Sequence, residues 1–228
     1  YMVADYYLDL WRSRMQNNNI SEIYEIYEPV DEDTTPEVPV GDGEKPEKVY
    51  KMLNGAKKLL AINPDTVGYL RVLSKDGSDP IIDLPVVQYY DNSKYLDRNF
   101  NGEESRTGSL FMDFRNHFDE VEDGKLKYEN SDNIIIYGHN MKDGSMFGQL
   151  HDFKGDAFLE QHPCVYILNE QECRIYRIFA VYEASVSTAE AYQLEFADDD
   201  EKQVFIDNCL RLSVIDTQVV PAADDSIL

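Results

Sequence analysis

Short strand-like segments separated by turns dominate the chain from residue 67 to residue 184. Runs rich in Val, Ile, Leu, Tyr and Phe predict strands at 67–73, 81–88, 109–114, 133–137, 164–168 and 173–184. Helical patterns interrupt the series at 145–153 and 198–212. Many short strands with few helices between them are typical of closed or half-closed antiparallel sheets. The pattern therefore predicts a mainly β, barrel-like fold rather than a doubly wound sheet.

The first quarter of the chain has a different, helical pattern. Residues 1–28 carry apolar side chains at helical spacing, and so do residues 48–63. The second helix is expected to end at Asn63, because a residue before proline disfavours helical backbone. Residues 29–46 are rich in Pro, Asp, Glu and Gly without periodicity, which predicts a flexible loop.

We therefore divide the chain into two parts. Residues 1–47 form an N-terminal helical segment with an acidic flexible loop, and residues 48–228 form the strand-rich domain. The formal net charge of −23 argues against general electrostatic binding to nucleic acid or to an anionic membrane surface. No run of residues approaches the ~20 apolar positions that span a bilayer.

Few residues of the sequence are candidates for a catalytic or metal-binding role. The four histidines lack HExxH spacing, and there is no GxSxG sequence, so neither a metal site nor a serine triad is indicated. His117 and His162 are expected to be surface or capping residues. His139 differs, because it follows the predicted strand 133–137 directly after a glycine. It is either a catalytic group at a strand end or a histidine with only a structural role.

Several segments together resemble the class B sortases, the cysteine transpeptidases of the Gram-positive cell surface. The similar segments are INPDTVGYLRV (62–72), LPVVQYYDNSKYL (84–96), GSLFMDFRN (108–116), IIIYGHNMKDGSMFGQL (134–150), HPCVYIL (162–168) and YRIFAVY (176–182). They occur in the family's order, and YGHNMKDGSMF is the most specific of them. The resemblance implies the closed eight-stranded sortase β-barrel, with added N-terminal helices and a helix in the connection before the last strands.

The resemblance also implies a mechanism. A cysteine thiolate attacks the carbonyl of a threonine in the C-terminal sorting motif of a surface protein, and an amine of the cell wall or of a pilin then takes the acyl group. His139 corresponds to the general acid and base. Asn92, Leu96, Tyr137, Thr188 and Tyr192 correspond to substrate-binding positions. No cofactor, no metal and no nucleic acid is implied.

The three cysteines do not correspond to the family's nucleophile. That residue lies in a Thr-Leu-x-Thr-Cys run after a strand that begins like Ser226-Ile227-Leu228, and an essential arginine follows later. We therefore expect both groups beyond Leu228, in a domain cut short before its nucleophile. Cys164, Cys173 and Cys209 have no CxxC spacing and are expected to be free packing residues.

The resemblance places such a protein at the extracytoplasmic face of the membrane. The family is usually held there by one N-terminal transmembrane helix, which would precede these residues. Two alternatives to a sortase enzyme stay open. One is a non-catalytic sortase-like module that binds peptides or scaffolds an assembly, and the other is an unrelated β-barrel hydrolase that uses His139 with an acidic partner.

Overall fold

The computed structural model describes residues 2–23, 54–76, 80–123, 125–169, 173–185 and 192–228. Its helices are α1 (Met2–Ile23), α2 (Asn54–Ile62), η2 (Lys94–Leu96), η3 (Gly148–Lys154), α3 (Asp156–Gln161) and α4 (Asp199–Leu212). Its strands are β1 (Thr66–Val72), β2 (Ile82–Val87), β3 (Leu110–Met112), β4 (Val121–Glu122), β5 (Lys125–Leu126), β6 (Ile136–Tyr137), β7 (Cys164–Leu168) and β8 (Cys173–Arg177). The predicted flexible loop and Thr188 lie outside these described residues.

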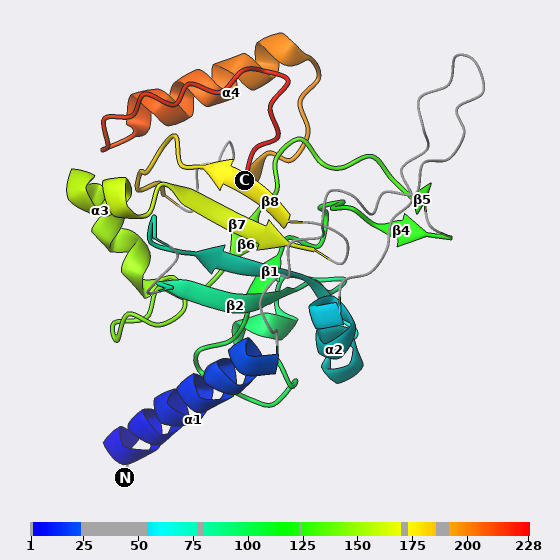
Figure 1. Ribbon diagram of the computed structural model, residues 1–228, viewed down its shortest axis with the longest axis vertical. Helices are drawn as coiled ribbons and strands as arrows, with labels where there is room; N and C mark the ends of the chain where they lie inside the picture. Colours follow the sequence, from blue (N-terminus) through cyan, green and yellow to red (C-terminus); the bar gives the residue numbers. More distant parts are fainter. Residues whose placement is uncertain (1, 24–53, 77–79, 124, 170–172, 186–191) are drawn as a thin grey trace.

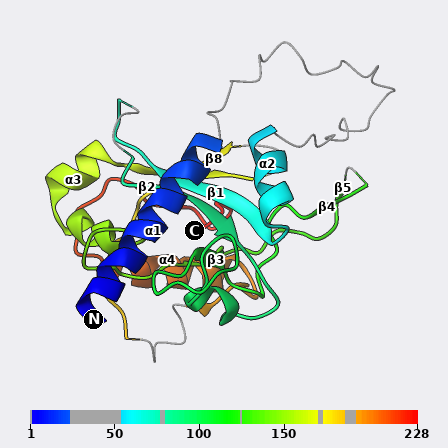
Figure 2. The same cartoon turned by 90° about the horizontal axis from the view of Figure 1, so that it is seen from below.

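One mixed sheet forms the centre of the molecule. Its six strands follow the order β6-β3-β2-β1-β7-β8, and only the β2–β3 pair is parallel. Figure 1 shows α1 on one side of this sheet and α4 on the other, and Figure 2 shows α1 crossing in front of it. The described strands fit a curled, half-closed sheet, whereas the closed eight-stranded barrel is not confirmed.

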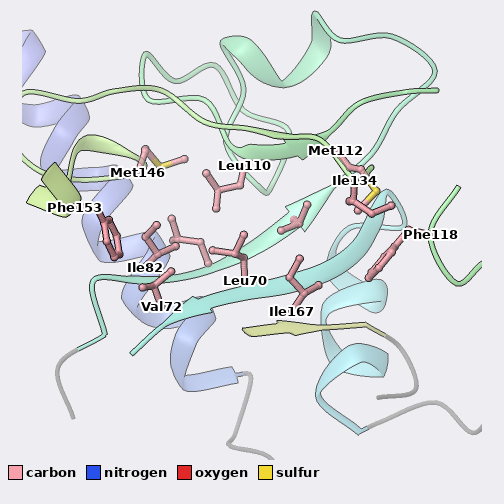
Figure 3. Packing of buried hydrophobic residues seen from close by; sticks show 12 residues of the cluster. Leu70, Val72, Ile82, Leu110, Met112, Phe118, Ile134, Met146, Phe153 and Ile167 are labelled. Carbon is pink, nitrogen blue, oxygen red and sulfur yellow. The ribbon is translucent and has the colours of Figure 1, made fainter. Parts of the chain in front are cut away.

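The two faces of the sheet bury different sets of side chains, because successive residues of a strand point to opposite faces. Ile82, Leu84 and Val86 of β2 share one face and pack in the larger core cluster, part of which Figure 3 shows. Val87 points to the other face and packs there with Ile20 of α1 and other residues. The alternating pattern of the sequence thus sets which helices cover which face.

The runs 81–88 and 109–114 shorten to Ile82–Val87 and Leu110–Met112 in the structure. Two other predicted strands lose more than half of their residues. The run 133–137 contributes only Ile136 and Tyr137 to β6, because the side-chain Oδ1 of Asn116 accepts the Ile135 N–H at 2.9 Å in place of a ladder bond. The run 173–184 ends as a strand at Arg177. Beyond that pair the Ile178 N–H still donates to the Pro163 oxygen at 3.0 Å, but proline has no N–H with which to continue the ladder.

The structure contains helices in the predicted segments, but their first or last residues differ from the prediction. Residues 1–28 contain the single helix α1 as far as they are described, and α2 ends at Ile62, directly before Asn63-Pro64. The helix expected at 145–153 is the 3₁₀ helix η3, and it starts later because Met146 has a φ of 53°. The sequence did not predict α3. No helix among the described residues is both long and apolar enough to cross a membrane.

Helix α4 begins with a side-chain cap. The Asp198 carboxylate accepts the Glu201 N–H at 2.9 Å, and the Glu201 carboxylate accepts the Ala197 N–H at 2.6 Å. Such reciprocal bonds satisfy backbone donors that a helix start leaves without partners. This cap fixes where the acidic segment predicted from the sequence turns into helix.

The Asp198 cap should contribute measurably to the free energy of unfolding. We expect Asp198→Ala to lower the free energy of unfolding by about 1 kcal/mol, because the Glu201 N–H loses its acceptor. Asp200→Ala removes a carboxylate from the same turn without removing the cap, so it should cost only a few tenths of a kcal/mol. Urea unfolding of both variants measures the difference, and equal losses would contradict the assigned cap.

Candidate active site around His139

His139 lies two residues after β6, on a loop that folds back on itself. Asn140 forms a bridge with Met146, and the Phe147 N–H donates to the His139 carbonyl oxygen at 3.0 Å. Gly138 is required for this packing, since a Cβ there would lie 2.5 Å from a Leu110 methyl carbon and 2.7 Å from the Phe147 ring. The local sequence therefore places the histidine firmly at the end of the strand.

The His139 imidazole has one hydrogen-bond partner among the described residues. Its Nε2 lies 2.7 Å from the backbone oxygen of Leu96. A carbonyl oxygen can only accept, so Nε2 carries the hydrogen and Nδ1 is left free. The ring is half-buried. His139 is thus held in one orientation, with one nitrogen available for proton transfer.

The carboxylate of Asp113, which follows β3, lies at the centre of the neighbouring polar cluster. Its side chain is fully buried and accepts five hydrogen bonds. Three come from Arg115, through the backbone N–H, Nε and Nη2, at 3.0, 2.8 and 2.9 Å. The others come from Asn92 Nδ2 at 3.0 Å and from the Tyr137 hydroxyl at 2.8 Å.

These contacts fix the protonation states of the cluster. Burial by itself would raise the pKa of the Asp113 carboxyl, but the hydrogen bonds from Arg115, Tyr137 and Asn92 outweigh it and hold that pKa well below its usual range. Burial, followed by the hydrogen bond to Asp113 and its charge, raises the pKa of Tyr137 well above the ordinary value. At neutral pH the carboxylate is therefore ionised, and Tyr137 is a neutral donor.

Tyr192 completes the cluster from the other side. Its ring stacks on Tyr137 with centroids 6.3 Å apart, and Tyr137 also packs on Phe111 at 5.1 Å. The Tyr192 backbone oxygen accepts a bond from Arg115 Nη2 at 3.4 Å. The connection that follows β8 is thus tied to the end of β3.

Four of the residues that the sequence assigns to substrate binding come together here. Asn92 and Tyr137 bond to Asp113, Tyr192 stacks on Tyr137, and Leu96 bonds to His139. The Leu96 side chain is 46% exposed, which leaves it free to contact a ligand. Thr188 lies outside the described residues, so its place in the site stays a prediction.

Asp113 and Arg115 were not assigned to the site from the sequence. Both belong to GSLFMDFRN, which carries part of the sortase resemblance. An acidic residue directly after a buried strand, followed two residues later by arginine, is the signal that could have marked them. Asn92 also has structural bonds that the sequence did not predict, because its Oδ1 accepts the Phe114 N–H at 2.9 Å and one Nδ2 hydrogen goes to Asp113. One N–H of its amide is left for a ligand.

The other histidines have partners of their own. His117 Nδ1 lies 2.8 Å from a Glu120 carboxylate oxygen, and His162 Nδ1 lies 3.1 Å from the Phe158 carbonyl oxygen at the end of α3. These contacts confirm a capping position for His162, although its side chain is buried. His151 Nε2 lies 2.6 Å from Asn140 Nδ2. No group of three or more His, Cys, Asp or Glu within the described ranges could hold a metal ion.

The three cysteines are free thiols. Cys164 opens β7 and Cys173 opens β8, while Cys209 is buried in α4 with its sulfur 3.6 Å from the Tyr182 hydroxyl. Burial raises the pKa of the Cys209 thiol. The hydrogen bond of the His139 ring in the described part of the chain goes to the Leu96 oxygen and not to a thiol. A groove of about 750 Å³ borders β8 and residues 218–221 and 225–228, and none of the predicted site residues lines it.

Comparison with known proteins identifies the fold. The chain is 33% identical over 174 residues to Sortase B of Listeria monocytogenes, covering 75% of the chain and 64% of that relative's length. Its structure matches sortase B of Bacillus anthracis in complex with AAEK1, with a TM-score of 0.74 and 28% identity over 96% of this chain and 88% of the other. A solved Sortase B complexed with triglycine matches with a TM-score of 0.67 and 30% identity, over 75% and 73% of the two chains.

The mixed sheet with a histidine at the end of β6 therefore defines a sortase. More narrowly, the chain belongs to the class B sortase family. It spans slightly less than two thirds of the length of the curated relative. No family model matches the chain.

The charge on Asp113 should make the stability of the site depend on pH. A carboxyl whose folded-state pKa is lowered stabilises the fold above its unfolded pKa of about 4, and this contribution is lost as the pH falls toward the folded pKa. We expect Asp113→Asn to cost roughly 2–4 kcal/mol at pH 7 and progressively less below about pH 4.

Chemical unfolding between pH 7 and pH 3 measures this difference. Tyr137→Phe is the matched control, since it removes one donor but leaves the charge, and should cost about 1 kcal/mol. If the difference in free energy of unfolding between the native chain and Asp113→Asn stays constant over this pH range, Asp113 does not stabilise the fold through its charge.

Proposed function

We propose that the chain carries the histidine-bearing part of a cysteine transpeptidase that cleaves a sorting motif after threonine and joins the acyl group to an amine. The orientation of His139 at the end of β6, with Nε2 bonded to the Leu96 oxygen, is the observation that carries the proposal. Membership of the class B sortase family supports it. The solved Sortase B complexed with triglycine supports an amine as the acceptor, because that peptide carries one.

In this mechanism the free Nδ1 of His139 transfers the protons. It first takes the proton of the attacking thiol and gives that proton to the amine that leaves when the thiolate attacks the threonine carbonyl. It later takes a proton from the amine that attacks the thioester and returns it to the thiolate that is released. Leu96, Asn92, Tyr137 and Tyr192 surround the peptide. Thr188 is also proposed to contact the peptide.

The attacking thiol is proposed to be a cysteine other than the three of this chain. Cys209 is buried with its pKa raised, which disfavours the thiolate. Cys164 and Cys173 pair with Arg177 and Leu168 at the two ends of the β7–β8 ladder, where regular pairing rather than a strained turn holds them. An arginine that stabilises the oxyanion is likewise proposed from the family and not assigned to a residue of this chain.

The partners follow from the same proposal. They are the C-terminal sorting peptide of a surface protein and an amine acceptor of peptidoglycan or of a pilin. We propose that the protein works at the extracytoplasmic face of the membrane, held there by an N-terminal anchor. Family membership is the support for this location.

A non-catalytic, peptide-binding sortase module is the second candidate. The observation that favours it is that the His139 ring bonds to the Leu96 oxygen and not to a thiol among the described residues. The two functions differ in one product, the thioester between a peptide and the enzyme. Mass spectrometry of the complete gene product incubated with sorting peptides distinguishes them, because only the enzyme gains the mass of an acyl group.

The role of His139 can be tested by substitution. In the complete gene product, His139→Ala should reduce peptide cleavage at least a hundredfold, because no group remains to protonate the leaving amine. The melting temperature should change by only a few degrees, since the ring is half-buried with one hydrogen bond. His117→Ala, another half-buried histidine with one polar partner, should leave cleavage unchanged. A variant that loses folding along with activity would point to a structural role for His139.

The side chains that are proposed to contact the peptide give a separate prediction. Leu96→Ala and Tyr192→Ala should each raise KM, or lower kcat/KM, about three- to thirtyfold, because each removes apolar surface from the bound peptide. Leu126→Ala is the matched control, since this leucine of β5 is 42% exposed, close to the 46% of Leu96. Steady-state kinetics with a fluorogenic peptide measure the effect. Unchanged kinetics for both site variants would place the peptide elsewhere.

A further inference from the structure

Arg115 presents a rigid hydrogen-bond donor beside the proposed peptide site. Its Nε and Nη2 are bonded to the Asp113 carboxylate, and Nη2 also bonds to the Tyr192 backbone oxygen. The guanidinium also interacts with the Tyr137 hydroxyl, Nη1 makes no bond to Asp113 or to Tyr192, and the side chain is 44% exposed. One edge of the guanidinium is therefore held, and the other edge is open.

Asp113 is itself fixed from several directions. Its backbone N–H donates to the Ile135 oxygen at 2.9 Å, and its backbone oxygen accepts a bond from Gln88 Nε2 at 2.8 Å. Its carboxylate takes two bonds from the Arg115 side chain in the fork geometry that matches guanidinium to carboxylate. A guanidinium held in this way loses little conformational entropy when a ligand binds to it.

A second open donor lies close to the first. Arg115 Nη2 and Asn92 Nδ2 bond to the same oxygen of Asp113, at 2.9 and 3.0 Å. The Asn92 amide keeps one N–H that its two described bonds do not use. Leu96, four residues after Asn92, and Phe114, directly before Arg115, are 46% and 48% exposed, so the segments that carry the donors also present apolar surface.

The charge of the pair indicates which ligand group fits. The ionised Asp113 carboxylate neutralises the Arg115 cation, and the whole chain has a formal net charge of −23. A carboxylate ligand would be repelled by the chain and would meet no net positive charge in the pair. The oxygen of a neutral amide accepts from such donors without this cost. Peptide carbonyl oxygens that alternate with apolar side chains match donors whose own segments also present apolar surface.

We propose that Arg115 binds a carbonyl oxygen of the sorting peptide and that Asp113 is the positioning residue that aims its guanidinium. This inference rests on the proposed function and adds a contact to it. It is separate from the oxyanion-stabilising arginine that the sortase resemblance implies. The Asp113–Arg115 pair also connects the segment that carries Asn92 with the segment that carries Tyr192, since Asn92 bonds to Asp113 and the Tyr192 backbone oxygen bonds to Arg115.

A double-mutant cycle on peptide binding tests the proposal. The probe is a fluorescent panel of short peptides with a central threonine, and fluorescence anisotropy gives the Kd of the best binder for the native complete gene product and its variants. We expect Arg115→Ala and Asp113→Asn each to weaken binding about five- to twentyfold. The double variant should be no weaker than the weaker single variant, because Asp113 acts through Arg115.

Arg115→Lys should also bind weakly, because an ammonium cannot keep the two-bond fork with Asp113. The control pair is Arg71→Ala and Asp83→Asn, an arginine–aspartate pair between β1 and β2 with an Nε–Oδ1 distance of 2.7 Å. It should leave the peptide Kd unchanged. If Asp113→Asn does not fold, Arg115→Ala and Arg115→Lys decide the question by themselves, since Arg115 is partly exposed.

The outcomes separate the two proposals. Native affinity in Arg115→Ala would overturn this inference and leave the proposed function standing. If the fold increases in Kd of the two single variants multiply in the double variant, Asp113 and Arg115 act independently, and the positioning role of Asp113 is overturned. A panel in which no peptide binds the native complete gene product would overturn both this inference and the proposed function.

Discussion

The buried carboxylate of Asp113 is the interaction on which the rest of the site depends. A charge removed from water is tolerated only when hydrogen bonds replace its hydration, and five such bonds converge on this side chain. They come from the segment after β2, the segment after β3 and the end of β6. One side chain therefore fixes the relative positions of three chain segments that are distant in sequence.

The loop after His139 is fixed by a different set of contacts. Arg14 of α1 donates to the Asp143 carboxylate at 2.9 Å and to the Asp143 backbone oxygen at 3.2 Å. Asp143 in turn accepts the N–H and the hydroxyl of Ser145. Gly148 lets the chain pass close to Met141, where a Cβ would lie 2.2 Å from a backbone oxygen. The N-terminal helix thus supports the loop that carries the histidine.

The sequence predicts what is set by local pattern. The run 164–168 is β7 without any shift, because its apolar, partly β-branched residues follow directly after a proline. His139 stood out because glycine and histidine follow a strand. Asp113 did not stand out, because its importance comes from Asn92 and Tyr137, which are 21 and 24 residues away in the chain. The strand boundaries at Ile136 and Arg177 also depend on partners rather than on propensity.

The protonation states divide the chemical roles within the site. Tyr137 stays protonated because burial and the neighbouring Asp113 charge raise its pKa, so it cannot act as a base near neutral pH. Asp113 is ionised, but all of its bonds are taken up inside the protein, which removes it as a proton acceptor. The Nδ1 of His139 is the remaining group of this cluster that is free to exchange a proton. In the proposed mechanism, the polar cluster therefore does not compete with the histidine for the proton.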